Sequence, residues 1–268
     1  MVLGKETVPF FVVFDTLPEV FDMAIQEAVI FNSQGEQKCL ANLIGEFHNQ
    51  AEIKEIKDLL LALGIKAEYL PGDNIKSGVL QKVHLNLYHS PISELFTKER
   101  LQVRFGHPYL TVSFFGPSET AGSLRDIGSA LGLPSLQVEQ VIRQGLHCVT
   151  EGINHYGSEL FGKRVLVLLE DHKKDLISRI LDDLGMKIIP IHQIKNRYLN
   201  PDTLRMFIHE SRVQLVIGAD QYWRRNGMGF PYLELPDSRR SFLGFNGFNN
   251  LAKSMVLALH GESPSFHE

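Results

Sequence analysis

The sequence has few cysteines, no long apolar run and no excess of positive charge. Its 268 residues include only Cys39 and Cys148, which form neither a CxxC pair nor a zinc set. This chain alone therefore cannot hold a four-cysteine iron–sulfur cluster, and we interpret both cysteines as small buried residues. Apolar runs such as residues 165–169 are far shorter than the roughly 20 residues of a membrane span, and no basic segment precedes an apolar signal core. We therefore expect a cytoplasmic protein without membrane contact.

The charge and composition narrow the class of protein further. Lys and Arg number 27 against 31 Asp and Glu, a net charge of -4, which is too little positive charge for a nucleic-acid binder. The sequence is 44% hydrophobic and 22% charged, close to the globular average. A chain of this length forms one large or two medium domains.

Short apolar runs alternate with amphipathic segments from residue 38 onward, which is typical of βα units and a parallel sheet. We expect strands at residues 39–45, 65–70, 83–89, 109–114, 163–169, 186–191 and 213–218. We expect helices at residues 51–63, 91–105, 118–131, 136–156, 175–184, 201–211 and 249–259. The fold class is α/β, with two Rossmann-like, doubly wound parallel-sheet domains joined by a long helix.

The same rhythm predicts where the domains begin and end. Residues 1–37, with a strand at 10–14 and a helix at 19–31, are too short for a domain and read as the remnant of a preceding one. The first Rossmann-like domain covers residues 38–133, a helical connector covers 134–158, and the second domain covers 159–268 with a closing helix.

Ligands of open α/β sheets gather at the carboxyl ends of the strands, which selects the candidate site residues. His89 and Ser90 end one strand, Gly116 and Ser118 open a helix directly after another, and Lys173 and Lys174 follow a third. A helix N-terminus and two lysines favour an anion. Each feature also has a plain structural interpretation, as a hydrogen-bonded histidine, a well-capped helix start or a solvated one.

Motifs that would specify a common chemistry are missing. The 11 histidines show no HExxH spacing, and there is no GxSxG elbow and no P-loop. Gly227-Met-Gly229 and Gly244-Phe-Asn-Gly247 do not complete GxGxxG, so the sequence does not indicate a dinucleotide site. No catalytic residue is assigned.

Several segments, taken in order, resemble the nitrogenase component 1 family, and in particular the α chain and the related cofactor-assembly scaffold. They span about residues 38 to 260 and are Lys82-Val-His-Leu-Asn-Leu-Tyr-His-Ser90, His107-Pro108, Phe114-Phe-Gly-Pro-Ser-Glu-Thr120, Ser123-Leu-Arg125, Gly162-Lys-Arg-Val165, Asp183-Leu-Gly-Met186, Gly227-Met-Gly-Phe-Pro231 and Gly244-Phe-Asn-Gly-Phe248. The resemblance implies Rossmann-like domains with a metallocluster held between them. It also implies a homologous subunit or a second copy as partner, and an ATPase similar to the iron protein.

The departures from the family concern its metal ligands. Ser90 occupies the place of the family's cofactor-binding cysteine, after a retained His89, and the matching serine three residues later survives as Ser93. A serine hydroxyl replaces a thiolate poorly on iron. Glu234 aligns with the cofactor-binding histidine and Lys173 with an arginine that approaches the cofactor.

Two further family positions, a glutamine and a histidine near the substrate, fall on Pro18 and Asp22. The cysteines of the subunit-bridging cluster belong upstream of where this sequence begins. The sequence thus resembles the family in its structural motifs but lacks the residues that bind metal in the family.

Three hypotheses follow. The first is a component 1-like subunit or scaffold that binds a metallocofactor, a precursor or a related anionic ligand between its domains, through His89, Ser90, Ser93, Gly116, Ser118, Lys173, Lys174 and Glu234. It is not itself competent for dinitrogen reduction, and any iron–sulfur-type cofactor is supplied with a partner. The second is a non-enzymatic small-molecule binding or regulatory protein derived from the family. The third is an ordinary oxidoreductase or transferase on a doubly wound fold.

Overall fold

A computed structural model describes residues 39–45, 47–71, 83–89, 109–169, 171–190, 201–218, 229–235 and 240–261. The strand predicted at residues 10–14 and the helices predicted at 19–31 and 91–105 lie outside these residues. No helix within the described ranges combines the length and the apolar character that a bilayer crossing requires.

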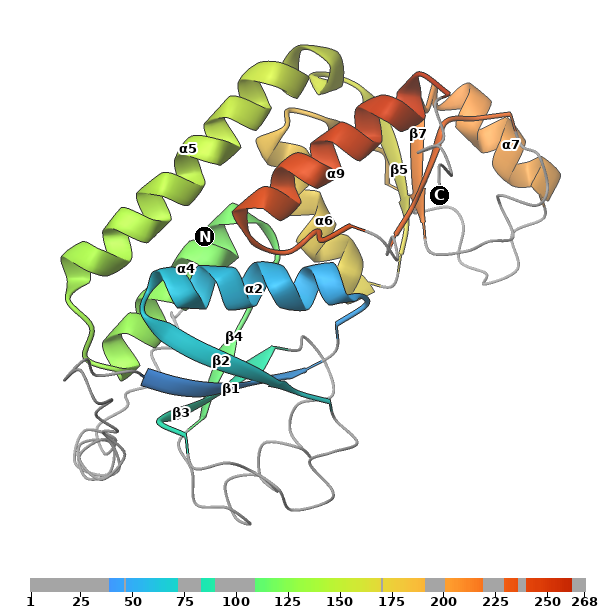
Figure 1. The fold of residues 1–268 in the computed structure, drawn as a ribbon. Coiled ribbons are helices and arrows are strands. Elements are labelled where there is room, and N and C mark those ends of the chain that lie inside the picture. The colour runs from blue at the N-terminus through green and yellow to red at the C-terminus, as the bar shows by residue number, and fades with distance from the viewer. Residues whose placement is uncertain are drawn as a thin grey trace, which may run out of the picture.

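The first sheet has four parallel strands in the order β2-β1-β3-β4. They are β1 (Cys39–Gly45), β2 (Ile65–Leu70), β3 (Leu85–His89) and β4 (Tyr109–Val112). Helices α2 (Gln50–Ala62) and α4 (Gly116–Ala130) lie on one face (Figure 1). Gly64 follows α2 with a φ of 79°, so the chain reverses into β2 through a left-handed residue, as a glycine permits.

The second sheet repeats this topology with the order β6-β5-β7-β8. Its strands are β5 (Arg164–Leu168), β6 (Lys187–Ile188), β7 (Leu215–Gly218) and β8 (Tyr232–Glu234). Helix α7 (Pro201–Glu210) packs on one face through Leu204 and Ile208, and α6 (Asp171–Asp183) packs on the other.

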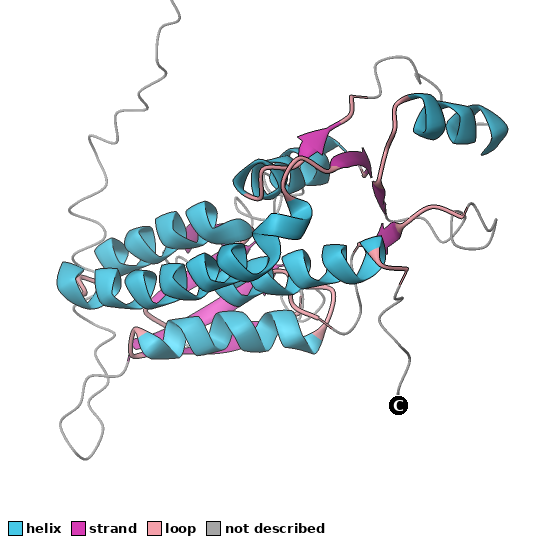
Figure 2. Ribbon diagram, turned by 90° about the horizontal axis from the view of Figure 1, so that it is seen from above, coloured by secondary structure: helices cyan, strands magenta, loops and turns pink. Residues whose placement is uncertain are grey.

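Two long helices connect the halves. Helix α5 (Ser135–Leu160) leads from the first sheet to the second, and α9 (Gly244–Leu259) packs along it, as the views in Figures 1 and 2 show. The helices approach closely because α5 has glycines at the contact. A Cβ on Gly145 would lie 2.1 Å from the Phe245 ring, and one on Gly152 would lie 1.8 Å from Asn249 Oδ1.

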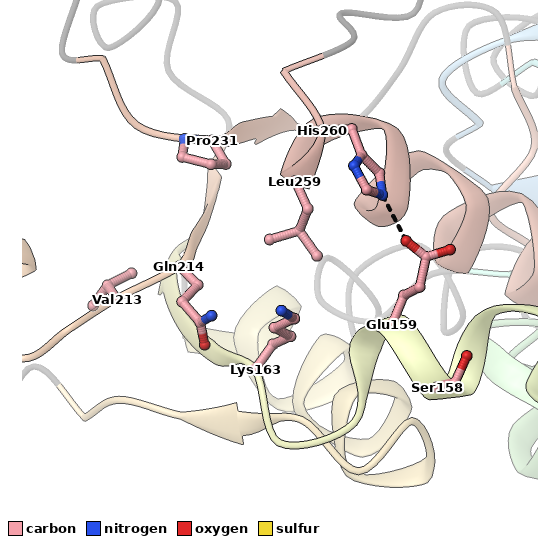
Figure 3. A pocket seen from close by; sticks show the side chains of 8 residues that line it. All are labelled: Ser158, Glu159, Lys163, Val213, Gln214, Pro231, Leu259 and His260. Carbon is pink, nitrogen blue, oxygen red and sulfur yellow. Dashed lines mark hydrogen bonds and ion pairs between the residues drawn. The ribbon is translucent and has the colours of Figure 1, made fainter.

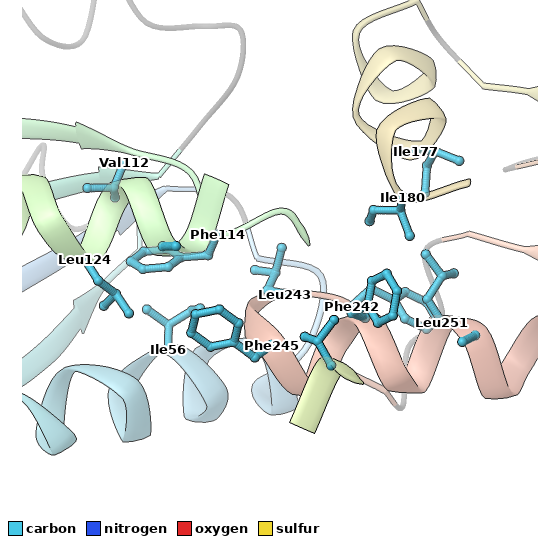
Figure 4. Packing of buried hydrophobic residues seen from close by; sticks show 14 of the residues in the cluster. Ile56, Val112, Phe114, Leu124, Ile177, Ile180, Phe242, Leu243, Phe245 and Leu251 are labelled. Atoms are coloured by element: carbon cyan, nitrogen blue, oxygen red, sulfur yellow. The ribbon is translucent and has the colours of Figure 1, made fainter. Parts of the chain in front are cut away.

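A single apolar cluster runs through both halves (Figure 4). It joins residues that pack against the first sheet, such as Ile56 of α2 and Phe114, to Phe245 and Leu251 of α9 and to Ile180 of α6. A smaller cluster lies between α7 and the second sheet. Both the main cluster and α9 therefore cross the boundary that the sequence predicts between two domains.

The predicted fold class is confirmed, while several predicted element boundaries were wrong; β6, for example, has only two residues, Lys187–Ile188, and α5 continues to Leu160. Helix α9 begins at Gly244, not at residue 249, because Gly244 and Gly247 lie in its first turn, where Gly247 avoids a clash with the Phe242 backbone. Strand β8 was not predicted, since its three residues are too few to show a period. Helix α6 begins at Asp171, four residues before the predicted start.

Candidate functional site at the carboxyl ends of the strands

His89 lies at the end of β3, where the sequence predicts a ligand-facing residue. Its side chain is only 8% exposed and stacks on the Phe47 ring with centroids 5.1 Å apart, and the Phe114 ring lies 5.7 Å away on a tilted plane. Phe47 also meets Tyr69 edge to face at 5.4 Å. Burial raises the pKa of the Tyr69 hydroxyl. These rings form an aromatic cluster at the carboxyl end of the first sheet.

Gly45 lets β1 approach this cluster. It ends β1, pairs in register with His89, and has a φ of 147°. A Cβ at this position would lie 1.7 Å from the His89 carbonyl oxygen. A side chain at residue 45 would collide with the His89 backbone. Glycine is therefore required for β1 and β3 to pair at this end.

The turn between β4 and α4 contacts the second half of the chain. Gly116 has a φ of 79° and is buried, and a Cβ there would lie 3.2 Å from Ile180 of α6. Phe115 forms an antiparallel bridge with Leu243, and the Gly244 N–H donates to the Phe114 carbonyl at 2.7 Å. Ser118 is exposed in the first turn of α4. The glycine therefore serves helix packing, and its predicted role toward an anion stays a prediction.

The sequence places the two lysines after a strand and just before a helix predicted to begin at residue 175, with a solvated helix start as one interpretation. Both belong to the first turn of α6, which begins at Asp171. Lys174 is half-buried, and its carbonyl accepts the Ser178 hydroxyl at 2.7 Å. Ile180, which touches Gly116, lies six residues further along α6, about 9 Å at 1.5 Å per residue. The lysines thus lie nearer the start of α6 than Ile180 does.

The remaining predicted residues have simple positions. Glu234 ends β8, pairs in register with Gly218 and is half-buried. Ser90, Ser93, Pro18 and Asp22 lie outside the described residues, as does the side chain of Lys173.

The two cysteines lie away from this edge. Cys39 begins β1 at the opposite edge of the sheet, and Cys148 lies within α5; both are half-buried free thiols. Burial raises the pKa of the Cys39 thiol, which favours the protonated form. In the described ranges no three His, Cys, Asp or Glu side chains come together to hold a metal ion. The donors that the structure describes therefore do not fit thiolate ligation of an iron cluster.

A polar network after β1 is a feature that the sequence analysis missed. Glu52 is 3% exposed and accepts the His48 N–H at 2.8 Å, while Asn49 Oδ1 accepts the Glu52 N–H at 2.9 Å. Asn49 Nδ2 donates to the Arg240 carbonyl at 3.0 Å. The network ties the end of β1 to the segment after β8. An Asn-x-x-Glu spacing directly after a strand, which is typical of a capping box, was its signal.

Comparison with known proteins identifies a family that the chain matches over most of its length. Residues 16–260 match the family described as nitrogenase component 1 type oxidoreductase. The nitrogenase molybdenum-iron protein alpha chain of Methanothermobacter marburgensis is 26% identical over 244 residues, 82% of this chain and 52% of that protein. The nitrogenase iron-molybdenum cofactor biosynthesis protein NifE of Methanococcus maripaludis is 24% identical over 244 residues, 81% of this chain and 50% of that protein. The chain spans about half the length of these curated relatives.

Solved structures share the fold. Nitrogenase Cp1 at pH 5 superposes with a TM-score of 0.66 at 15% identity, over 90% of this chain and 60% of that one. A Zn(II)-bound variant of AdcAII from Streptococcus pneumoniae gives a TM-score of 0.54 at 9% identity, over 83% of this chain and 99% of that one. At these identities the likeness concerns the arrangement of two parallel sheets alone.

Proposed function

Because the chain belongs to the family of nitrogenase component 1 type oxidoreductases, we propose that it is a subunit or scaffold that binds a metallocofactor, a cofactor precursor or a related anionic ligand between its two sheets. The observation that carries this proposal is the meeting of the strand ends. Phe115, after β4, bridges to Leu243, and Asn49, after β1, bonds to Arg240. Loops that follow strands of the first sheet thus contact the segment that follows β8 of the second.

An anionic ligand fits the chemistry of this region. Lys173 and Lys174 lie in the first turn of α6, where the helix dipole adds partial positive charge. Cations gathered at a helix N-terminus repel that charge, and a bound anion offsets the repulsion. His89 supplies an imidazole held between aromatic rings at the end of the first sheet. In the proposed function Ser90, Ser93, Gly116, Ser118 and Glu234 line the same region.

The chain does not use its own thiolates in this function. Neither cysteine lies at the carboxyl ends of the strands, so iron ligands come from the cofactor itself or from a partner. The proposed partner is a homologous subunit or a second copy, working with an ATPase similar to the iron protein in the cytoplasm. Dinitrogen reduction by this chain alone is not part of the proposal.

The aromatic cluster favours a second candidate function. Phe47 stacks on the buried His89, and the fully buried Phe114 lies beside His89 on a tilted plane, while the described residues offer no thiolate set. The half-buried Phe47 ring is the member of the cluster that a flat organic molecule could stack on. The chain would then be a non-enzymatic binding or regulatory protein of the same family.

Thermal unfolding with citrate, a polycarboxylate, tests the anion site. Citrate at 100 times its Kd adds about 2.7 kcal/mol to the free energy of unfolding, which raises the Tm by roughly 5 to 10 °C for a chain of this size. The double variant Lys173→Ala with Lys174→Ala should lose that rise. The matched variant Lys54→Ala with Lys253→Ala removes two exposed cations elsewhere and should keep it. An equal rise in both variants would show that citrate binds at another place.

Metal analysis separates the two candidates. Purified alone without oxygen, the chain should be colourless and carry well below about one iron per molecule, because it lacks a thiolate set. Iron retained only in a complex with a partner subunit supports the scaffold, and a metal-free complex supports the organic ligand. A brown protein with stoichiometric iron and sulfide when purified alone contradicts both.

A further inference from the structure

A pocket of about 430 Å³ opens at the amino ends of the second sheet's strands, the edge opposite the proposed site (Figure 3). Five segments form it: the end of α5, the turn before β5, the segments before β7 and β8, and the end of α9. The lining residues are Ser158, Glu159, Lys163, Val213, Gln214, Pro231, Leu259 and His260. Its volume lies within the range of small-molecule sites.

Lys163 supplies the ammonium group of this pocket. It belongs to the segment Gly162-Lys-Arg-Val165, whose other members have structural roles. Gly162 makes the turn with a φ of 73°, Arg164 Nε donates to the Ser211 carbonyl at 2.7 Å, and Val165 is fully buried. Within the described ranges no ion pair or side-chain hydrogen bond involves the Lys163 ammonium, which points into the pocket in Figure 3.

Gln214 adds a second hydrogen-bond donor to the pocket, and the Glu159 carboxylate contacts His260. Gln214 Oε1 accepts the Arg164 N–H at 3.2 Å, so the amide fixes its Nε2 as a donor. Glu159 Oε2 lies 2.6 Å from His260 Nε2, and this pair joins the ends of α5 and α9. Val213, Pro231 and Leu259 provide an apolar wall beside Lys163.

The local charge selects the kind of anion. The last turns of α5 and α9 both line the pocket, and each helix C-terminus carries about half a negative elementary charge. The Glu159 carboxylate adds negative charge, which its contact with His260 offsets in part. A phosphate dianion is therefore repelled more strongly than a carboxylate monoanion, and a carboxylate offers the two acceptor oxygens that Lys163 and Gln214 can bind.

We propose that this pocket binds a small aliphatic monocarboxylate. Its carboxylate pairs with the Lys163 ammonium and the Gln214 amide, and its aliphatic part lies against Val213, Pro231 and Leu259. This site is separate from the anion site at the carboxyl ends of the strands, and neither depends on the other.

Isovalerate is the probe for the test, with saturation-transfer NMR and a titration on the full chain. We expect saturable binding with a Kd on the order of 1 mM, as a ligand of this size allows. Lys163→Met should weaken it at least about tenfold, because it removes a charge-assisted hydrogen bond. Lys163→Arg keeps the charge and should bind within about threefold of wild type. Lys187→Met is the matched control, since Lys187 is exposed on the same sheet outside the pocket, and it should leave the Kd unchanged.

Phosphate at equal ionic strength provides the second arm. It should not displace isovalerate from the wild-type chain, but it should compete in Glu159→Gln, which removes the repelling carboxylate. Absence of saturable isovalerate binding, an unchanged Kd in Lys163→Met, or equal competition by phosphate in the wild type would each overturn the proposal.

Discussion

The two sheets share one strand order but differ in the residues of their central strands. In the second sheet, β5 and β7 are apolar through Val165, Leu166, Val167 and residues 215–217. In the first sheet, β1 and β3 bury Asn42, Asn86 and His89, each no more than 8% exposed. The two sheets therefore share one topology, but the central strands of the second sheet are apolar, whereas those of the first sheet bury polar side chains.

One pair of positions makes this comparison residue by residue. Asn42 and Asn86 are opposite each other on β1 and β3, and Asn42 Nδ2 donates to Asn86 Oδ1 at 2.9 Å. Leu166 and Val216 are opposite each other on the corresponding strands β5 and β7. Since an apolar pair supports the same topology, the amides of the first sheet are not required by the strand order itself. Burial of such polar groups costs free energy unless they are hydrogen-bonded.

His84, just before β3, extends the polar face. Its Nδ1 accepts the Leu40 N–H at 3.0 Å, which places the proton of the neutral ring on Nε2. His84 is 5% exposed, and neither its Nε2 nor Asn42 Oδ1 has a hydrogen-bond partner among the residues described. The first sheet therefore holds a buried donor and a buried acceptor, and the described strands of the second sheet contain no equivalent pair.

Substitution of the glycines that end strands in the two sheets should give the largest difference. Gly45→Ala should lower the free energy of unfolding by more than about 3 kcal/mol, because its Cβ meets the His89 backbone at 1.7 Å and its φ is 147°. Gly218→Ala should cost about 1 kcal/mol, since its nearest neighbours lie at 3.2 and 3.4 Å. Urea unfolding of both variants measures the difference. Equal losses would show that the two strand ends are packed alike.

A double-mutant cycle on the amide pair should show a smaller effect. Asn42→Leu and Asn86→Val copy the second sheet, and each alone should cost about 1 to 3 kcal/mol by removing one partner of a buried hydrogen bond. The double variant should cost less than the sum by about 1 kcal/mol, which is the coupling of the two amides. Strictly additive losses would mean that the amides do not stabilise each other.

Prediction from sequence succeeded where a hydrophobic period was long enough to read. The boundaries predicted for β1 and β2 match the structure, and α5 begins at Ser135, next to its predicted start, although it continues beyond its predicted end to Leu160. The start of α9 was missed because glycines stand in its first turn, where propensity opposes a helix. Tertiary packing against α5 and the Phe242 backbone determines that start, and a single sequence does not carry this information.

The candidate site was predicted less completely, for a physical reason. The rule of strand ends selected His89, because it depends only on where a strand stops, whereas Glu234 was selected by the family resemblance alone, since its three-residue strand was not predicted. It could not foresee that Gly116 packs on Ile180, or that Asn49 reaches Arg240 almost 200 positions later. Contacts between segments so distant in sequence are set by the packing of the two halves, as is the pocket around Lys163.

Ser90→Cys should have a small effect at the end of the first sheet. Ser90 follows His89 in sequence, the resemblance aligns it with a cysteine of the family, and serine and cysteine side chains differ little in volume. The free energy of unfolding should change by less than about 1 kcal/mol, a shift in Tm of a few degrees. Calorimetry of the purified variant provides the measurement. Loss of soluble protein would show that the serine hydroxyl belongs to a buried hydrogen-bond network.

The smallest expected effect concerns the contact of Glu55 on α2 with Asn246 on α9, which joins the two halves. Asn246 Nδ2 donates to Glu55 Oε1 at 3.0 Å, yet burial raises the pKa of this carboxyl, and the hydrogen bonds from Asn246 offset the rise only in part. A raised pKa in the folded state means that stability is greatest below the unfolded pKa of about 4.3 and falls as pH rises through the folded value. Glu55→Gln keeps the acceptor oxygen and removes the charge. It should therefore raise the free energy of unfolding at pH 7 by less than about 1 kcal/mol, and this gain should vanish near pH 4.

Glu139→Gln is the control of opposite sign for this prediction. The exposed Glu139 has its pKa lowered, first by the hydrogen bond from Arg125, so its charged form stabilises the fold above the unfolded pKa. Its replacement should lower the free energy of unfolding at pH 7 and have no effect at low pH. Urea unfolding of both variants across this pH range compares the two carboxylates. A loss of stability in Glu55→Gln at pH 7 would mean that its charge strengthens the contact between the halves more than burial weakens it.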